Sequence, residues 1–142
     1  MLNFRATLLS AAVAGFMTTP ALAQDTPNLV GTWKGSAYAV HIGATPYREA
    51  NSPSVQFPGN AIEYTYAITE QRGQRFAGKM SGGRFSETII GALAPNNRTG
   101  MMLDDDGQYH LTLVDANTID MCYTHLYPTS KVVACFQAKR QP

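Results

Sequence analysis

The chain has 142 residues and a mass of 15.4 kDa, which is the size of one domain. Eleven basic and ten acidic residues give a formal net charge of +1, so we expect no electrostatic surface for nucleic acid or an anionic membrane. Apolar residues make up 44% of the chain and support a folded core, whereas two cysteines and three histidines exclude a zinc finger or a multi-disulfide framework.

The first 23 residues have the features of a secretory signal peptide. Arg5 precedes an apolar stretch over 6–17, and Ala21-Leu22-Ala23 supplies the small residues of a cleavage site before Gln24. The stretch is shorter than the roughly 20 residues of a membrane-spanning helix. We therefore expect cleavage near Ala23 and one mature domain over 24–142, exported to a bacterial periplasm or secreted, without a transmembrane segment.

The mature chain alternates apolar and polar residues, as strands do, with turn residues between the segments. The predicted strands cover 29–42, 61–70, 74–80, 85–94, 99–105, 108–115, 119–127 and 130–139. Short connections after the second strand favour antiparallel neighbours. One long loop remains over about 43–60 and contains Pro46, Tyr47, Arg48, Pro53, Phe57 and Pro58. Loops of this length in a compact domain are usually functional.

The turn residues also predict which residues lie opposite each other in the hairpins. The expected pairs are Ile68 with Phe76, Tyr66 with Gly78, Met80 with Phe85, Leu93 with Gly100, Asp104 with Tyr109, Leu113 with Met121 and Cys122 with Cys135. Residues that lie opposite each other have Cα atoms roughly 4.5–5.5 Å apart, which is within disulfide reach. We expect a structural disulfide on the outer face, because the periplasm is oxidising and no Cys-x-x-Cys motif indicates a redox-active pair.

These registers give one continuous apolar face. It contains Ile62, Tyr64, Tyr66, Ile68, Phe76, Met80, Ile89, Leu93, Met102, Leu111, Leu113, Met121, Tyr123, Val132, Ala134 and Phe136, with Gly78, Gly91 and Gly100 among them to leave room for aromatic neighbours. Eight antiparallel strands can bury such a face by closing into an up-and-down β-barrel, which also removes the sheet edges. The predicted fold is therefore an all-β, eight-stranded antiparallel barrel, and the alternative is a small two-sheet β-sandwich.

Gly31-Thr32-Trp33 lies near the start of the first predicted strand. A Gly-x-Trp motif before an eight-strand meander resembles the calycin group, which includes lipocalins and avidins. The resemblance implies that Trp33 has a structural role in closing one end of the barrel, that Lys139 or Arg140 packs on it, and that ligand enters at the other end. Trp33 is the only tryptophan, so biotin binding of the avidin type is not expected, and the Thr-Asp-Tyr type segment of lipocalins is not found.

The inner face becomes polar at the end that carries the turns at 82–83, 106–107 and 128–129. The candidate ligand-binding residues there are Tyr64, Tyr66, Glu87, Asp104, Tyr109, Tyr123 and His125. An apolar floor with a few polar groups at the mouth is typical of ligand sites, and the carboxylates favour a cationic or hydroxyl-bearing ligand. The alternatives are a hydrated rim or an internal network in which Asp104 orients His125.

We expect a periplasmic, non-catalytic protein that binds a small, mostly apolar ligand at the open barrel end, with no cofactor and no metal. Asp104-Asp105-Asp106-Gly107 resembles a cation loop but lacks the spacing of an EF-hand, and a hairpin turn explains it better. An alternative function is a protein-interaction or protease-inhibitor module acting through the end loops and outer surface. An enzyme with His125 as general base is a third hypothesis.

Overall fold

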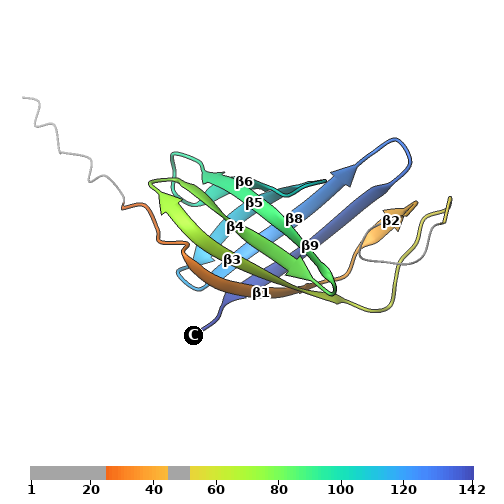
Figure 1. Cartoon of the computed structure of the whole chain (residues 1–142), viewed down its shortest axis with the longest axis horizontal. Coiled ribbons are helices and arrows are strands. Elements are labelled where there is room, and N and C mark those ends of the chain that lie inside the picture. The colour runs from red at the N-terminus through yellow and green to blue at the C-terminus, as the bar shows by residue number, and fades with distance from the viewer. Residues whose placement is uncertain (1–24, 45–51) are drawn as a thin grey trace, which may run out of the picture.

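The computed structural model describes residues 25–44 and 52–142, which form one all-β sheet (Figure 1). The predicted signal peptide and Pro46, Tyr47 and Arg48 lie outside these residues. The strands are β1 (Gly31–Ala37), β2 (Val40–Ile42), β3 (Ile62–Arg72), β4 (Arg75–Gly82), β5 (Phe85–Leu93), β6 (Thr99–Leu103), β7 (Gln108–Asp115), β8 (Thr118–Leu126) and β9 (Lys131–Arg140). In the described part of the chain, no helix has the length and apolarity to cross a membrane.

The sheet closes on itself and confirms the predicted eight-stranded antiparallel barrel; the β-sandwich alternative is wrong. The strand order is β1-β3-β4-β5-β6-β7-β8-β9-β2, and β1 also pairs with β9. The predicted first strand is divided, because β1 pairs with the end of β9 and β2 pairs with its beginning. Both parts keep one register, with Gly35 opposite Ala138 and Val40 opposite Val133, so together they form one stave of the barrel.

Two of the predicted pairs are confirmed, namely Leu93 with Gly100 and Cys122 with Cys135. The other predicted pairs are wrong by two residues. The observed pairs are Ile68 with Gly78, Tyr66 with Met80, Met80 with Glu87, Met102 with Tyr109, Leu113 with Ile119 and Leu111 with Met121.

Turn geometry and bulges explain these differences. Gly73 and Gly83 have φ values of 59° and 57° and begin two-residue turns over 73–74 and 83–84. A three-residue loop over 71–73 and a two-residue turn over 82–83 were expected, so the observed turns begin two residues and one residue later. β-Bulges follow between Ile68 and Glu70 and between Leu113 and Asp115. The β6–β7 connection spans four residues, 104–107, because Leu103 pairs with Gln108.

A shift of two residues keeps every side chain on its own face, so the predicted core survives the register errors. The buried apolar residues are Leu29, Trp33, Ala37, Tyr66, Ile68, Phe76, Met80, Ile89, Leu93, Met102, Tyr109, Leu111, Leu113, Ile119, Met121, Ala134 and Ala138. Of the predicted inner face, Ile62, Tyr64, Tyr123, Val132 and Phe136 are only partly buried. Gly91 has the expected space-making role, since a Cβ there would collide with the ring of Phe76.

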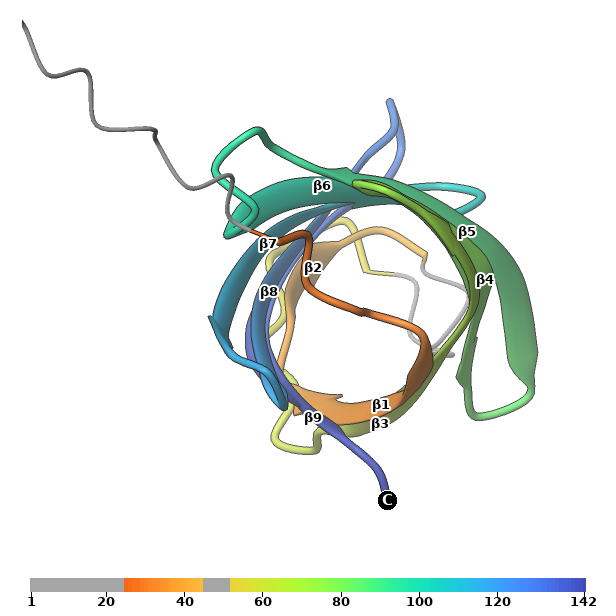
Figure 2. The same cartoon turned by 90° about the vertical axis from the view of Figure 1, so that its left-hand side faces the viewer.

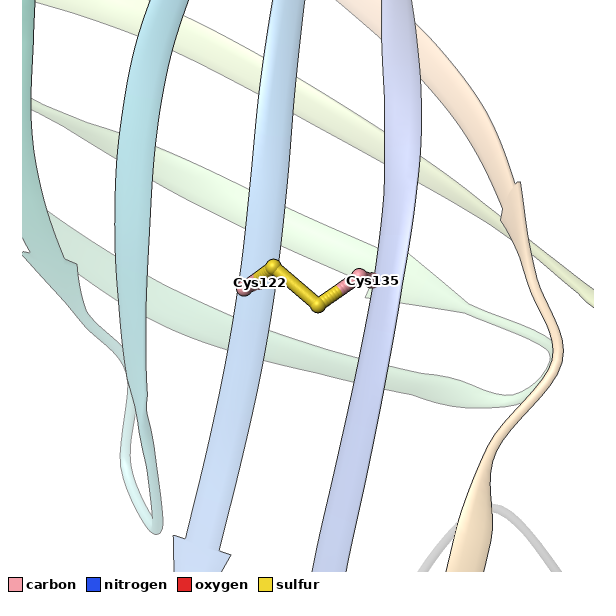
Figure 3. Close-up of a disulfide and its surroundings, with 2 residues drawn as sticks. All are labelled: Cys122 and Cys135. Atoms are coloured by element: carbon pink, nitrogen blue, oxygen red, sulfur yellow. A yellow bond between two sulfur atoms is a disulfide. The ribbon is translucent and has the colours of Figure 1, made fainter.

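The disulfide joins β8 and β9, the two strands of the last hairpin (Figure 3). Cys122 and Cys135 have Cα atoms 4.1 Å apart, and their alternation with buried neighbours places them on the outer face as predicted. A cross-link across so short a loop stabilises the folded chain by about 3 kcal/mol, mainly by restricting the unfolded chain. A disulfide of this kind fits an extracytoplasmic protein.

Candidate functional site

One end of the barrel is sealed around Trp33. Its side chain is fully buried, and its indole Nε1 donates a hydrogen bond of 2.9 Å to the carbonyl of Leu29. The guanidinium of Arg140 lies 4.1 Å from the centre of the Trp33 ring, in a cation–π contact. The implied partner of the tryptophan is therefore Arg140, whereas the Lys139 ammonium donates to Thr118 Oγ1.

The segment before β1 crosses this end of the barrel and is fastened on both sides (Figure 2). Arg140 donates from its guanidinium to the carbonyls of Asn28 and Val30, at 2.6 Å and 2.7 Å. On the other side, Gln71 accepts from the Leu29 amide at 2.7 Å and donates to the carbonyl of Pro27 at 2.8 Å. Long-range polar contacts thus hold an apolar plug in place, which confirms the predicted closed end.

The opposite end, here called the mouth, is formed by the β4–β5, β6–β7 and β8–β9 connections and by β2 (Figure 1). Tyrosine hydroxyls and carboxylates meet there. Tyr109 donates to Asp104 Oδ2 at 2.9 Å, and Tyr123 donates to Asp106 Oδ1 at 2.7 Å. The two tyrosine rings lie 4.8 Å apart, so the neighbouring strands β7 and β8 present a pair of anchored rings.

Asp104 belongs to the loop and not to a strand, which corrects the predicted pairing of Asp104 with Tyr109. Its Oδ1 accepts hydrogen bonds from the amides of Asp106 and Gly107, at 3.3 Å and 2.7 Å, and so shapes the four-residue connection. Tyr109 instead lies opposite Met102 and reaches Asp104 with its hydroxyl. Asp104 therefore bonds to Tyr109, whereas Asp106 accepts the hydrogen bond from Tyr123.

His125 is buried and held from two sides. Its Nδ1 lies 3.3 Å from Asp106 Oδ2, and its Nε2 lies 2.7 Å from Ser130 Oγ in the β8–β9 loop. The ring of Tyr127 covers it at 4.7 Å. Asp106, rather than Asp104, therefore orients the histidine, and the imidazole couples two loops of the mouth.

Three carboxylates converge at the mouth. One oxygen each from Glu87, Asp104 and Asp106 lie within 4.8 Å of one another, a grouping of a size that could hold a metal ion. Burial raises the pKa of Asp104 above its ordinary value. Within the described ranges, neither aspartate forms an ion pair with lysine or arginine; Asp106 pairs only with His125. The mouth thus gathers three carboxylates in a chain whose formal net charge is +1.

Aromatic rings form the floor beneath the carboxylates. Tyr66 lies edge-on to Tyr109 with ring centres 5.8 Å apart, and burial raises the pKa of both hydroxyls. Tyr64 lies beside Phe136, at 6.2 Å. The predicted residues Tyr66, Glu87, Asp104, Tyr109, Tyr123 and His125 therefore come together, while Tyr64 lies at the edge of the group.

Sequence reasoning missed two polar residues of the mouth, Asp106 and Ser130, whereas His41 was expected there at the end of the first strand. Asp106 was hidden by its assignment to a two-residue turn, although its place in a run of three aspartates was a signal. Ser130 lies in the last loop and bonds to His125. His41, near the end of the first predicted strand, is 2% exposed.

On the outer side of the same end, a groove of about 450 Å³ runs between Leu103, Leu126, Tyr127 and the loop aspartates.

No known protein-family profile matches the chain, and no curated protein matches it by sequence. Among solved structures, an S-type phycobiliprotein lyase from Guillardia theta is similar in structure, with 9% sequence identity and a TM-score of 0.36. The match covers 80% of this chain and 89% of the other. The calycin resemblance is thus supported at the level of architecture, by the closed eight-stranded barrel, and not by a family-level sequence match.

The expectation of a non-catalytic protein is corrected by this comparison. The matched structure is described as a lyase, so we no longer hold that expectation. The low identity and TM-score do not establish catalysis in this chain.

Proposed function

We propose that the chain works in the periplasm and holds a small, mostly apolar molecule at the mouth of the barrel. The observation that carries this proposal is the contrast between the two ends. The end around Trp33 is filled by its buried side chain, which bonds to Leu29. The mouth instead presents tyrosine rings beside the carboxylates of Asp104 and Asp106. Apolar surfaces with a few placed polar groups are typical of small-molecule sites.

The proposed location is supported by the N-terminal segment and the disulfide. Residues 1–23 have the charge, apolar stretch and small-residue cleavage site of a signal peptide. Fractionation of cells expressing the full chain should place a product beginning at Gln24 in the periplasm. A full-length product retained in the cytoplasm with free thiols would contradict the location without bearing on the ligand site.

Binding is tested most simply with the neutral apolar fluorophore N-phenyl-1-naphthylamine. We expect its emission to rise on addition of the mature chain, and we expect Tyr123→Ala to weaken this response, because Tyr123 is the partly buried ring beside Asp106. The matched control Tyr38→Ala changes a tyrosine that is 65% exposed. An unchanged emission with the wild-type chain would contradict the proposal.

A second candidate function is a protein-interaction module, and exposed apolar side chains favour it. Phe57 is 80% exposed and Leu126 is 72% exposed, while Tyr38 and Val55 are also exposed. Exposed apolar groups that cluster on a surface often mark contacts with other proteins. Replacing Phe57 and Leu126 by serine should abolish capture of a partner if this function holds, and should leave fluorophore binding intact if the mouth is the site.

A further inference from the structure

His41 is a buried polar side chain without a partner. It is 2% exposed, and among residues 25–44 and 52–142 neither Nδ1 nor Nε2 has a hydrogen-bond partner, although its backbone pairs with Gln56. Buried polar groups in folded proteins are nearly always bonded, because a missing partner leaves the cost of lost hydration uncompensated. A bound molecule that supplies the partner would remove this cost.

The strand pairing places His41 inside the mouth. His41 lies opposite Val132, and Val132 lies opposite His125 on its other side. Directly opposite residues of antiparallel strands point to the same face, so His41 shares the inner face with His125, which contacts Asp106. The two histidines stand two strand spacings apart, or about 10 Å, with the partly buried Val132 between them.

The carboxylates and His41 cannot act on one ion. The oxygens of Glu87, Asp104 and Asp106 lie within 4.8 Å of one another, and His41 is not part of that group. An ion held by the three carboxylates would therefore leave His41 unused. A molecule with two separated polar groups can use both, lying across Val132 with Tyr123 as an aromatic neighbour.

We propose that the mouth binds a small organic ammonium compound that carries a hydroxyl group several bonds from its nitrogen. This inference rests on the proposed function and names the class of ligand. The ammonium would donate to the carboxylates and lie near the Tyr109 and Tyr123 rings, which attract cations. The hydroxyl would bond to the imidazole of His41, and the apolar body would cover Val132.

The test uses three related compounds and the mature chain. Tyramine has both polar groups, phenethylamine lacks the hydroxyl, and tyrosol replaces the ammonium by a neutral alcohol. In titrations followed by NMR, we expect tyramine to bind about tenfold more tightly than either of the other two and to shift the His41 ring signals. Tyrosol loses hydrogen bonds to charged carboxylates, and phenethylamine leaves the buried imidazole of His41 without a partner; each loss costs about this factor. Equal affinity for tyramine and tyrosol, or no binding of tyramine, would overturn the inference.

Two variants assign the ends of the molecule. Glu87→Gln should weaken the binding of tyramine about tenfold and leave the affinity for tyrosol unchanged. His41→Leu should weaken the binding of tyramine and leave the affinity for phenethylamine unchanged. Glu70→Gln, which alters an exposed carboxylate paired with Arg72, is the matched control and should change neither. Circular dichroism shows whether each variant is folded. If both mouth variants fold and bind tyramine as the wild type does, the inference is wrong.

The proposed function can survive that failure. If N-phenyl-1-naphthylamine binds and tyramine does not, the site is apolar and has no cation preference, so only this inference is overturned. If neither compound binds, both proposals are overturned.

Discussion

The two ends of the barrel use polar groups for opposite purposes. At the closed end, the side chains of Arg140 and Gln71 form hydrogen bonds with backbone carbonyls and an amide of the segment before β1. At the mouth, the His41 side chain is buried without a hydrogen-bond partner in the described part of the chain, and Asp104 is held where burial raises its pKa. The closed end is thus arranged for stability, whereas the mouth keeps groups that cost stability. Such costs are typical of functional sites.

The comparison predicts its largest effect for Trp33→Ala. Trp33 is fully buried and its indole bonds to the carbonyl of Leu29, so truncation removes both the buried ring and this hydrogen bond. The free energy of unfolding should fall by about 3–5 kcal/mol, measured by urea denaturation followed by far-UV circular dichroism. Ile90→Ala, at a side chain 56% exposed on β5, is the control and should have little effect. A similar small loss for both would show that the end is not sealed by Trp33.

Arg140→Met should have the next largest effect. Methionine keeps apolar contact with Trp33 but cannot donate to Asn28, Val30 and Ala116. We expect a loss of about 2 kcal/mol, and hydrogen exchange of the Leu29 and Trp33 amides should accelerate more than that of β5. Unchanged hydrogen exchange at these amides would show that Arg140 does not hold the segment before β1 in place.

At the mouth the sign should reverse. His41→Leu replaces an unpartnered buried imidazole by an apolar side chain, so the empty chain should gain about 1 kcal/mol of unfolding free energy. Thermal unfolding without added ligand measures the change. A destabilised variant would mean that the imidazole contributes to folding and that the two ends do not differ as described.

The smallest effect concerns pH. Burial raises the pKa of Asp104 above 3.8, so its protonated form favours folding. This contribution is fully present below the unfolded-state pKa and is lost as pH rises through the higher folded-state pKa. Between about pH 3 and pH 7, urea midpoints should therefore fall more with rising pH in the wild type than in Asp104→Asn. Parallel midpoint curves would contradict a desolvated carboxylate at this position.

The sequence predicted the core better than the pairing, for a reason visible in the hairpins. The turns that begin at Gly73 and Gly83 start two residues and one residue later than expected, and the bulges near Ile68 and Leu113 have no marker in the residues that form them. Each error displaced a strand by two residues, which leaves the inner face unchanged. Alternation alone therefore identified the buried side chains.

The site was predicted in chemistry but not in detail. Tyr109, Tyr123 and His125 could be assigned to the mouth because they share the alternation of their strands. Asp106 could not, since its role depends on a four-residue loop that Asp104 shapes through backbone hydrogen bonds. The position of His41 at this end followed from the first predicted strand, but its burial did not, because it arises from the pairing of β2 with β9 and from the bridge between His41 and Gln56.

The central claim is that ligand binds at the mouth and not at the closed end. Because Trp33 is the only tryptophan, its indole gives a single NMR signal that reports on the closed end. During titration with N-phenyl-1-naphthylamine, the amides of Gly43, Gly107 and Ser130 should shift, while the Trp33 indole signal stays in place. A shift of the indole signal without shifts at the mouth would contradict the account.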